Sequence, residues 1–215
     1  MAKLKSTFKN MFLSLSIICL AVALLLAQVN KMTAKPIAEA KALKLQNAIG
    51  EVVPEFNNDP VAESYMIVGE GGDSLLVYPA TKDDEVVGFA ISSSANGFAG
   101  EIQIMVGFDM DDKVVNYEIL QHAETPGLGS KMGDWFKDIE SNSKSIIGRD
   151  MSLGALAVKN DGGDIDAITA STITSRAFLK AVNKAFSAYS GTKTDSYSGA
   201  TPEKGKDDDI DEKDN

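Results

Sequence analysis

The sequence contains only one cysteine and one histidine among its 215 residues. Cys19 therefore has no partner for a disulfide within the chain, and no cluster of cysteines and histidines predicts a zinc or iron–sulfur site. His122 is not surrounded by residues at metal-ligand spacing. No histidine–nucleophile or paired-carboxylate arrangement stands out either. We therefore do not expect the chain alone to be a hydrolase or a transferase.

The sequence also lacks an excess of basic residues. Its 21 Lys and Arg face 31 Asp and Glu, which gives a formal net charge of −10. Nucleic-acid surfaces are basic, so this balance argues against a nucleic-acid partner. Much of the negative charge lies in the last dozen residues, and residues 191–215 as a whole hold too few apolar side chains to form a core. We predict that residues 191–215 are a disordered acidic tail.

One long apolar stretch, residues 11–29, stands near the N-terminus. At about 1.5 Å per residue, a helix of this length just spans a hydrocarbon core of roughly 30 Å. A cleaved signal peptide is the alternative, because Ala21 and Ala23 form a small-residue pair. Three leucines at 24–26 follow that pair and prolong the apolar stretch. The pattern therefore favours a retained single-pass anchor in the cytoplasmic membrane.

Lysines on both sides of the anchor bear on its orientation. Lys3, Lys5 and Lys9 precede it, and cytoplasmic flanks are enriched in basic residues. Lys31 and Lys35 on the far side weaken this asymmetry. The pattern predicts a cytoplasmic N-terminus at residues 1–10 and an extracytoplasmic position for the bulk of the chain.

The rest of the sequence predicts an α+β fold, in which a mainly antiparallel sheet is packed with helices. Pro36 is expected to open a connecting helix that ends before Pro54, within a connecting segment at 30–62. The folded domain is expected at 63–190. Alternating apolar residues and turn signals predict a series of strands, at 65–68, 75–78, 86–92, 101–108, 114–120, 152–158 and 165–168. A short helix is expected at 132–139, with Trp135 and Phe136 in the core.

A cluster of hydroxyl residues precedes the last predicted helix. Residues 166–176 read D-A-I-T-A-S-T-I-T-S-R, with five hydroxyl residues in the seven positions from Thr169. Ser and Thr are good helix N-caps, which is one interpretation of the cluster. The other is that the free amides at the helix start hold a phosphate. The helix is predicted from a repeating apolar face, formed by Ile173, Ala177, Ala181, Ala185 and Tyr189, with Phe178, Val182 and Phe186 alongside.

The same residues resemble the flavinylation motif of the FMN-binding domain family, usually Asp-x-x-Ser/Thr-Gly-Ala-Ser/Thr. The resemblance implies that Thr172 carries covalent FMN through a phosphoester bond, that Thr169 opens the motif and that Asp166 precedes it. Ala170 stands where the family usually has Gly, and Ser171 where it usually has Ala. Ser171 therefore offers a second hydroxyl beside the expected site.

A second segment, E-T-P-G-L-G at 124–129, also resembles the family, where this loop lies near the flavin. Read locally, it is only a turn that contains Pro and Gly. The resemblance implies that the loop binds cofactor through Glu124, Thr125, Gly127, Leu128 and Gly129. Two cations near these motifs are expected to pair with the phosphate, or else to be solvated surface charges: Lys131 and Arg176. The segment G-F-A-G at 97–100 resembles the family more weakly.

The tail contains S-G-A-T at 198–201, which spells the usual flavinylation tetrapeptide. Asp195 stands three residues before Ser198, as Asp166 does before Thr169, but no helix is predicted after this segment. We attribute this match to composition, but Thr201 remains a rival to Thr172.

FMN-binding domains of this kind occur in the G subunit of the Rnf (Rsx) electron transport complex and in the C subunit of the sodium-pumping NADH:quinone reductase. The resemblance covers most of the chain and implies an electron-relay protein of the Rnf ferredoxin:NAD oxidoreductase, without separate catalytic activity. It also implies other membrane subunits as partners, and a flavin transferase that attaches the FMN. The alternatives are the sodium-pump protein, a flavoprotein of another extracellular reductase chain, and a cofactor-free extracytoplasmic binding or adaptor domain.

Overall fold

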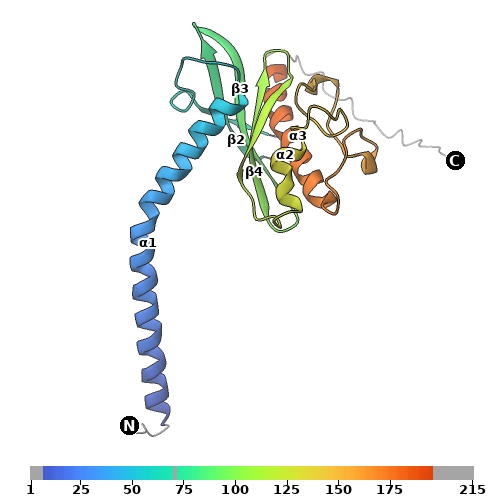
Figure 1. Cartoon of the computed structure of the whole chain (residues 1–215). Coiled ribbons are helices and arrows are strands. Elements are labelled where there is room, and N and C mark those ends of the chain that lie inside the picture. Colours follow the sequence, from blue (N-terminus) through green and yellow to red (C-terminus); the bar gives the residue numbers. More distant parts are fainter. Residues whose placement is uncertain (1–6, 70–71, 196–215) are drawn as a thin grey trace, which may run out of the picture.

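The computed structural model describes residues 7–69 and 72–195 and begins with one continuous helix, α1, Phe8–Val52. The prediction of a separate helix that opens at Pro36 is wrong, because Pro36 lies inside α1. Proline removes one intrahelical hydrogen bond, which bends a helix without always ending it. Figure 1 shows that α1 bends on its way to the folded domain.

By length and composition, α1 is a candidate to cross a membrane, and its apolar segment is not buried against the rest of the described chain. Its 45 residues extend over roughly 68 Å, which is more than twice the thickness of a hydrocarbon core. The C-terminal end of α1 is buried against the domain, through Ala48, Ile49 and Val52. The helix therefore has length for both a membrane span and a stalk.

Five antiparallel strands form one sheet in the order of the sequence. Their bounds are β1 Tyr65–Val68, β2 Ser74–Lys82, β3 Glu85–Asn96, β4 Glu101–Asp109 and β5 Val114–Gln121. The five strands predicted between 65 and 120 are confirmed, and four of them are longer than expected. Asp83, Asp84 and Asp112 adopt positive φ in the tight turns between strands, a conformation that Asp tolerates. The sheet is therefore a simple meander.

The strands predicted at 152–158 and 165–168 are wrong. A 3-10 turn, η2 Met151–Leu153, starts the first segment, and the Asp150 side chain caps it by accepting from the Ser152 amide. Val158 and Ile165 form only an isolated bridge. Three further short elements complete the described chain. The turn η1 Gly129–Lys131 and the helix α2 Met132–Trp135 precede this region, and the turn η3 Lys159–Asp161 lies within it. Phe136 is buried and Trp135 partly buried, as expected of core residues.

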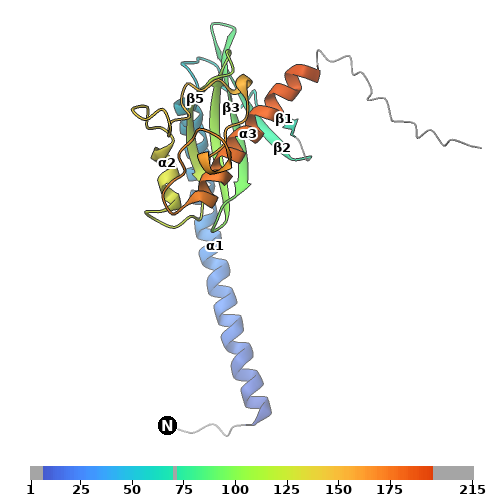
Figure 2. The same ribbon diagram turned by 90° about the vertical axis from the view of Figure 1, so that its right-hand side faces the viewer.

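Helices cover the two faces of the sheet, as Figures 1 and 2 show. The long C-terminal helix, α3 Thr172–Asp195, packs on one face and forms the larger core with the strands. The end of α1 packs on the opposite face against Tyr78, Ala90 and Met105. The predicted apolar face of α3 is confirmed from Ala177 to Tyr189, but Ile173 is 51% exposed. The α+β class with an antiparallel sheet is therefore correct.

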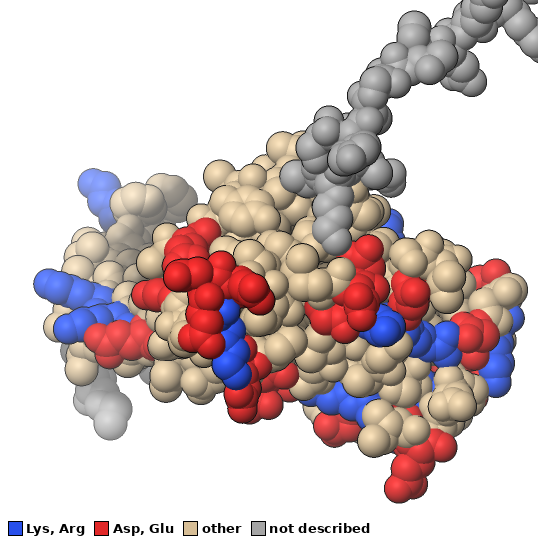
Figure 3. Space-filling model, turned by 90° about the horizontal axis from the view of Figure 1, so that it is seen from above, with Lys and Arg blue, Asp and Glu red and all other residues tan. Residues whose placement is uncertain are grey.

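The last helix extends beyond the expected C-terminal end of the folded domain. α3 continues to Asp195, past the expected end of the domain at residue 190. The remaining tail, with its S-G-A-T segment at 198–201, lies outside the described residues, as do residues 1–6. On the face seen from above in Figure 3, acidic and basic side chains are interspersed. This face therefore does not present the single-sign basic field of a nucleic-acid surface.

Gly107 on β4 allows α1 to dock on the sheet. A Cβ at this position would lie 1.7 Å from the Val52 carbonyl oxygen. We expect Gly107→Ala to destabilise the full-length protein in detergent by roughly 2–3 kcal/mol in urea unfolding. Gly50→Ala is the matched control, because nothing lies within 4 Å of its added methyl group and Ala favours helix by about 1 kcal/mol. Equal unfolding free energies for the two variants would contradict this account of docking.

Candidate functional site

Three segments far apart in the sequence enclose a cavity of about 480 Å³ at one end of the domain. They are the β3–β4 turn, the loop at 124–129 and the start of α3, and they lie at the lower end of the domain in Figure 1. Its lining residues are Phe98, Glu124, Thr125, Leu128, Gly129, Ala170, Ser171, Thr172, Ile173 and Thr174. The two motifs identified in the sequence therefore meet in one site.

The first turn of α3 leaves backbone donors at this cavity. Ser175 is the first residue whose amide donates to a carbonyl, that of Ser171, at 3.0 Å. Among the described residues, the amides of Thr172, Ile173 and Thr174 donate to no carbonyl or side-chain oxygen. The N-cap interpretation therefore does not account for these donors. Free amides at the positive end of a helix dipole favour an anion such as a phosphate group.

Two hydroxyls of the cluster are structural. Ser175 is fully buried, and its hydroxyl donates to the Ser171 carbonyl at 3.0 Å and accepts from the Ile168 amide at 2.9 Å. Thr174 is 1% exposed and donates to Glu124. Thr169 is exposed and does not line the cavity. Thr172 and Ser171 are therefore the hydroxyl residues of the cluster that line the cavity without a described side-chain bond.

Ala170 adopts a left-handed backbone conformation, with φ of 61°. This is the position at which the flavinylation motif usually has Gly, and Gly reaches this region without a steric cost. We expect Ala170→Gly to stabilise the protein by about 1 kcal/mol, measured by urea unfolding of the full-length chain in detergent. Ala170→Val should destabilise it, because a β-branched residue is strained at positive φ. A destabilised Gly variant would contradict the interpretation that strain is stored here.

Glu124 joins the three segments of the site. It is 4% exposed, and its carboxylate accepts from the Ala99 amide at 3.0 Å and from the Thr174 hydroxyl at 2.6 Å. Gly97 and Gly129 pack directly on this carboxylate, since a Cβ on either would come within 2.6 Å of one of its oxygens. Both oxygens thus already accept bonds from the protein. The structure gives Glu124 a role as a cross-link, where the sequence suggested a contact to the flavin.

The expected phosphate partners are placed elsewhere. Arg176 donates two hydrogen bonds to Asp161, at 2.7 and 2.6 Å, and this pairing lowers the pKa of the Asp161 carboxyl. Lys131 is exposed at the end of η1, and neither cation lines the cavity. Gly127, at φ of 77°, shapes the loop by donating its amide to Ser130 and also lies outside the lining. Backbone amides are therefore the donors best placed for an anion here.

Asp166, three residues before Thr169, anchors the approach to the motif. Its carboxylate pairs with Lys159 at 2.7 Å and accepts from the Ser143 hydroxyl at 2.6 Å, and these bonds lower its pKa. Its carbonyl accepts from the indole of Trp135 at 2.9 Å. Asp166 thus holds the loop that carries the hydroxyl cluster and does not belong to the cavity lining.

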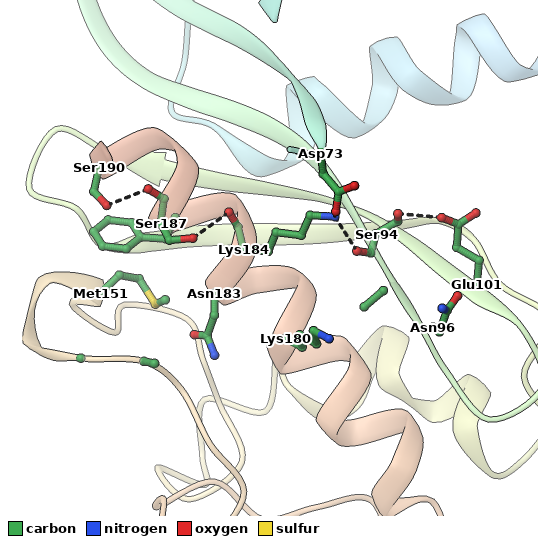
Figure 4. Close-up of a pocket in the computed structure, with 14 residues that line it drawn as sticks. Asp73, Ser94, Asn96, Glu101, Met151, Lys180, Asn183, Lys184, Ser187 and Ser190 are labelled. Atoms are coloured by element: carbon green, nitrogen blue, oxygen red, sulfur yellow. Dashed lines mark hydrogen bonds and ion pairs between the residues drawn. The ribbon is translucent and has the colours of Figure 1, made fainter. Parts of the chain in front are cut away.

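A larger cavity of about 790 Å³ lies beside α3, where residues of β3, β4 and the loop that follows Met151 also line it (Figure 4). Its polar groups largely satisfy one another. Lys184 pairs with Asp73 at 2.7 Å, and the Ser94 hydroxyl donates to Glu101 at 2.7 Å. Asn183, which also lines this cavity, bonds both backbone groups of Leu156. None of the residues of the two sequence motifs lines this cavity, so it does not compete as the cofactor site.

Four residues that line the cavity are not among the site residues predicted from the sequence: Phe98, Ala170, Ile173 and Thr174. Phe98 belongs to the G-F-A-G segment, whose weak resemblance to the family was the available signal. Ile173 was assigned to the buried face of α3 because its spacing fits that face. The helix begins only one residue earlier, so Ile173 stands in the first turn beside the cavity.

The match to a protein-family model supports the assignment of this region. The model of the FMN-binding domain family matches residues 97–187, which include all the residues that line the smaller cavity. A solved structure, the C subunit of the Na⁺-translocating NADH-quinone reductase from Parabacteroides distasonis, is similar with a TM-score of 0.45 and 21% identity, over 66% of this chain and 78% of that chain.

Several curated relatives align over most of their length. The G subunit of the ion-translocating oxidoreductase complex of Escherichia coli K12 is 36% identical over 170 residues, which are 75% of this chain and 81% of the relative. The corresponding proteins of Shewanella amazonensis and Yersinia pestis are 35% and 33% identical, over 84% and 83% of this chain and 86% and 88% of theirs. The chain therefore belongs to the family of G subunits of ion-translocating oxidoreductase complexes.

Proposed function

We propose that this chain is a membrane-anchored flavoprotein that relays electrons through covalently bound FMN within an ion-translocating ferredoxin:NAD oxidoreductase of the Rnf type. The observation that carries the proposal is the arrangement at the start of α3. Thr172 lines a cavity at the start of α3, where three backbone amides have no acceptor within the described part of the chain, inside the region that matches the FMN-binding domain family. The relatives from ion-translocating oxidoreductase complexes support the assignment to such a complex.

The residues present fit an FMN group. The Thr172 hydroxyl would supply the oxygen of a phosphoester, and the amides of Thr172, Ile173 and Thr174 would bind the remaining phosphate oxygens. The apolar side chains of Phe98, Leu128 and Ile173 in the same lining suit a flat ring system. FMN supplies the redox chemistry, since it can hold one or two electrons, while the protein fixes its position and excludes water from one side.

Maturation requires a partner, because the described residues that line the cavity include no base bonded to Thr172 that would activate its hydroxyl. In the proposed reaction a flavin transferase uses FAD as the donor. The new bond would join Thr172 Oγ1 to the FMN phosphorus as the pyrophosphate bond of FAD breaks, and AMP and the hydroxyl proton would be released. Covalent attachment would keep the cofactor on the protein outside the cytoplasm.

The proposed position is the cytoplasmic membrane, with α1 as a single span and the folded domain on the extracytoplasmic side. The apolar part of α1 supports the span, and the lysines before it support a cytoplasmic N-terminus. The other membrane subunits of the complex would be its partners. A membrane anchor keeps a tethered flavin close to such partners without a soluble carrier.

The proposal is tested by purifying the full-length chain in detergent from cells that also express a flavin transferase. Intact mass spectrometry should show an increase equal to one FMN less one water. Reductive titration should then bleach the flavin absorbance reversibly. An unmodified mass, from cells in which the transferase modifies a second substrate, would overturn the proposal.

A further inference from the structure

Phe98 lines the same cavity as Thr172, yet it is 70% exposed. A single exposed apolar residue is common on protein surfaces and means little alone. Phe98, however, is accompanied by Leu128, 42% exposed, and Ile173, 51% exposed, which line the cavity from two other segments. Three large apolar side chains from three segments thus remain open to solvent around one cavity.

The backbone on both sides of Phe98 is held in place. The Gly97 amide donates to the Gly100 carbonyl at 2.8 Å, and the Ala99 amide donates to the Glu124 carboxylate at 3.0 Å. Gly97 also packs so tightly against Glu124 and Ile102 that a Cβ would not fit. The turn is therefore fixed by the cross-link described above, and it holds an aromatic ring in the open at a set position. Such preorganisation lowers the entropy cost of binding a flat group.

The cavity lining combines two chemically different kinds of group. The start of α3 offers the free amides of residues 172–174, which suit a phosphate. Phe98, Leu128 and Ile173 offer apolar surface, which suits an uncharged ring. A ligand that matches both kinds of group carries an anionic group and a flat aromatic ring.

We infer that Phe98 is a positioning residue for the cofactor ring: its side chain packs against one face of the isoalloxazine, and Leu128 and Ile173 pack against the other. This inference rests on the proposed function and adds to it the orientation of the ring. Aromatic rings pack favourably when offset or edge to face, and the ring pairs within the described residues do not include Phe98. The flavin ring would thereby be shielded from water on the side that Phe98 covers.

The test uses Phe98→Trp in the full-length, flavin-loaded protein. Flavin content is read after denaturation, by in-gel fluorescence, where the environment of the ring no longer matters. Native fluorescence is read separately. We expect a several-fold loss of native fluorescence per bound flavin, because an indole in contact with a flavin quenches its excited state. Met66→Trp is the matched control, since Met66 is a 72% exposed residue on β1 outside the cavity lining.

Phe98→Ala gives an independent measurement. Per bound flavin, it should raise the quenching of native fluorescence by iodide, because one face of the ring becomes accessible. If flavin is present and both Phe98 variants behave like Met66→Trp and wild type, the inference is overturned while the proposed function stands. If wild type carries no flavin, the proposed function fails first and the inference fails with it. Should Phe98→Trp load poorly, the iodide result for Phe98→Ala decides.

Discussion

Replacing Thr172 by alanine is expected to leave the chain without covalent flavin. The substitution removes the oxygen that would form the phosphoester, while the free amides at the start of α3 remain. In-gel fluorescence after denaturation should show a dark band at the wild-type level of expression. Thr172→Ser keeps the hydroxyl and should keep most of the label. The loss is expected to be complete, because an amide can bind a phosphate but cannot form the bond.

Three alanine variants serve as controls for this result, since each removes another hydroxyl near or resembling the motif: Ser171→Ala, Thr169→Ala and Thr201→Ala. All three should stay labelled. Ser171 is the most informative, because it lines the cavity and is 8% exposed, so it is less accessible to a transferase than the half-buried Thr172. A dark band for Thr201→Ala with a fluorescent Thr172→Ala would move the attachment site to the tail.

Glu124→Ala is expected to destabilise the protein by about 3 kcal/mol, because it leaves the buried Thr174 hydroxyl and the Ala99 amide without their acceptor. The three segments around the cavity would then no longer be joined by this carboxylate. Flavin labelling should fall as well, although the carboxylate itself is not proposed to bind the flavin. Urea unfolding of the full-length chain in detergent measures the first effect, and in-gel fluorescence the second.

Glu124→Gln separates the cross-link from the charge. The amide oxygen can accept from Ala99, and the Thr174 hydroxyl can rotate to accept from the amide NH₂. This variant should therefore retain most of the stability and labelling. Thr174→Val gives the reciprocal test, and its effect should be largely absent in the Glu124→Ala background. Additive losses in that double mutant would contradict the cross-link.

Ala170 combines an unusual residue for the motif with an unusual backbone conformation. The sequence showed that Ala stands where the family motif usually has Gly, and the structure shows a positive φ at that residue. The turn is thus kept despite the substitution, at the cost of local strain. The left-handed conformation explains why Gly suits this position in the motif.

Local pattern in the sequence was enough to predict the elements that depend on neighbouring residues. An apolar stretch predicts the anchor, and four-residue spacing predicts the buried face of α3. Alternation and turn residues predict the five strands of the sheet, together with two, at 152–158 and 165–168, that do not form. The two motifs could also be located, because each is contiguous in the chain. Local pattern failed at Pro36, where the cost of a lost hydrogen bond did not outweigh the continuation of the helix on both sides.

Which side chains and amides of the site are free to bind a ligand, by contrast, was decided only by the tertiary structure. The pairing of Arg176 with Asp161, 15 residues away, and of Glu124 with Thr174, 50 residues away, places these side chains in the framework of the site. The exposure of Phe98 depends on the fold of the turn that Glu124 clamps. A hydrogen bond or an ion pair satisfies a side chain wherever its partner lies in space. Because spacing along the chain does not reveal such partners, the free hydroxyl and the free amides could not be distinguished from their neighbours before the fold was known.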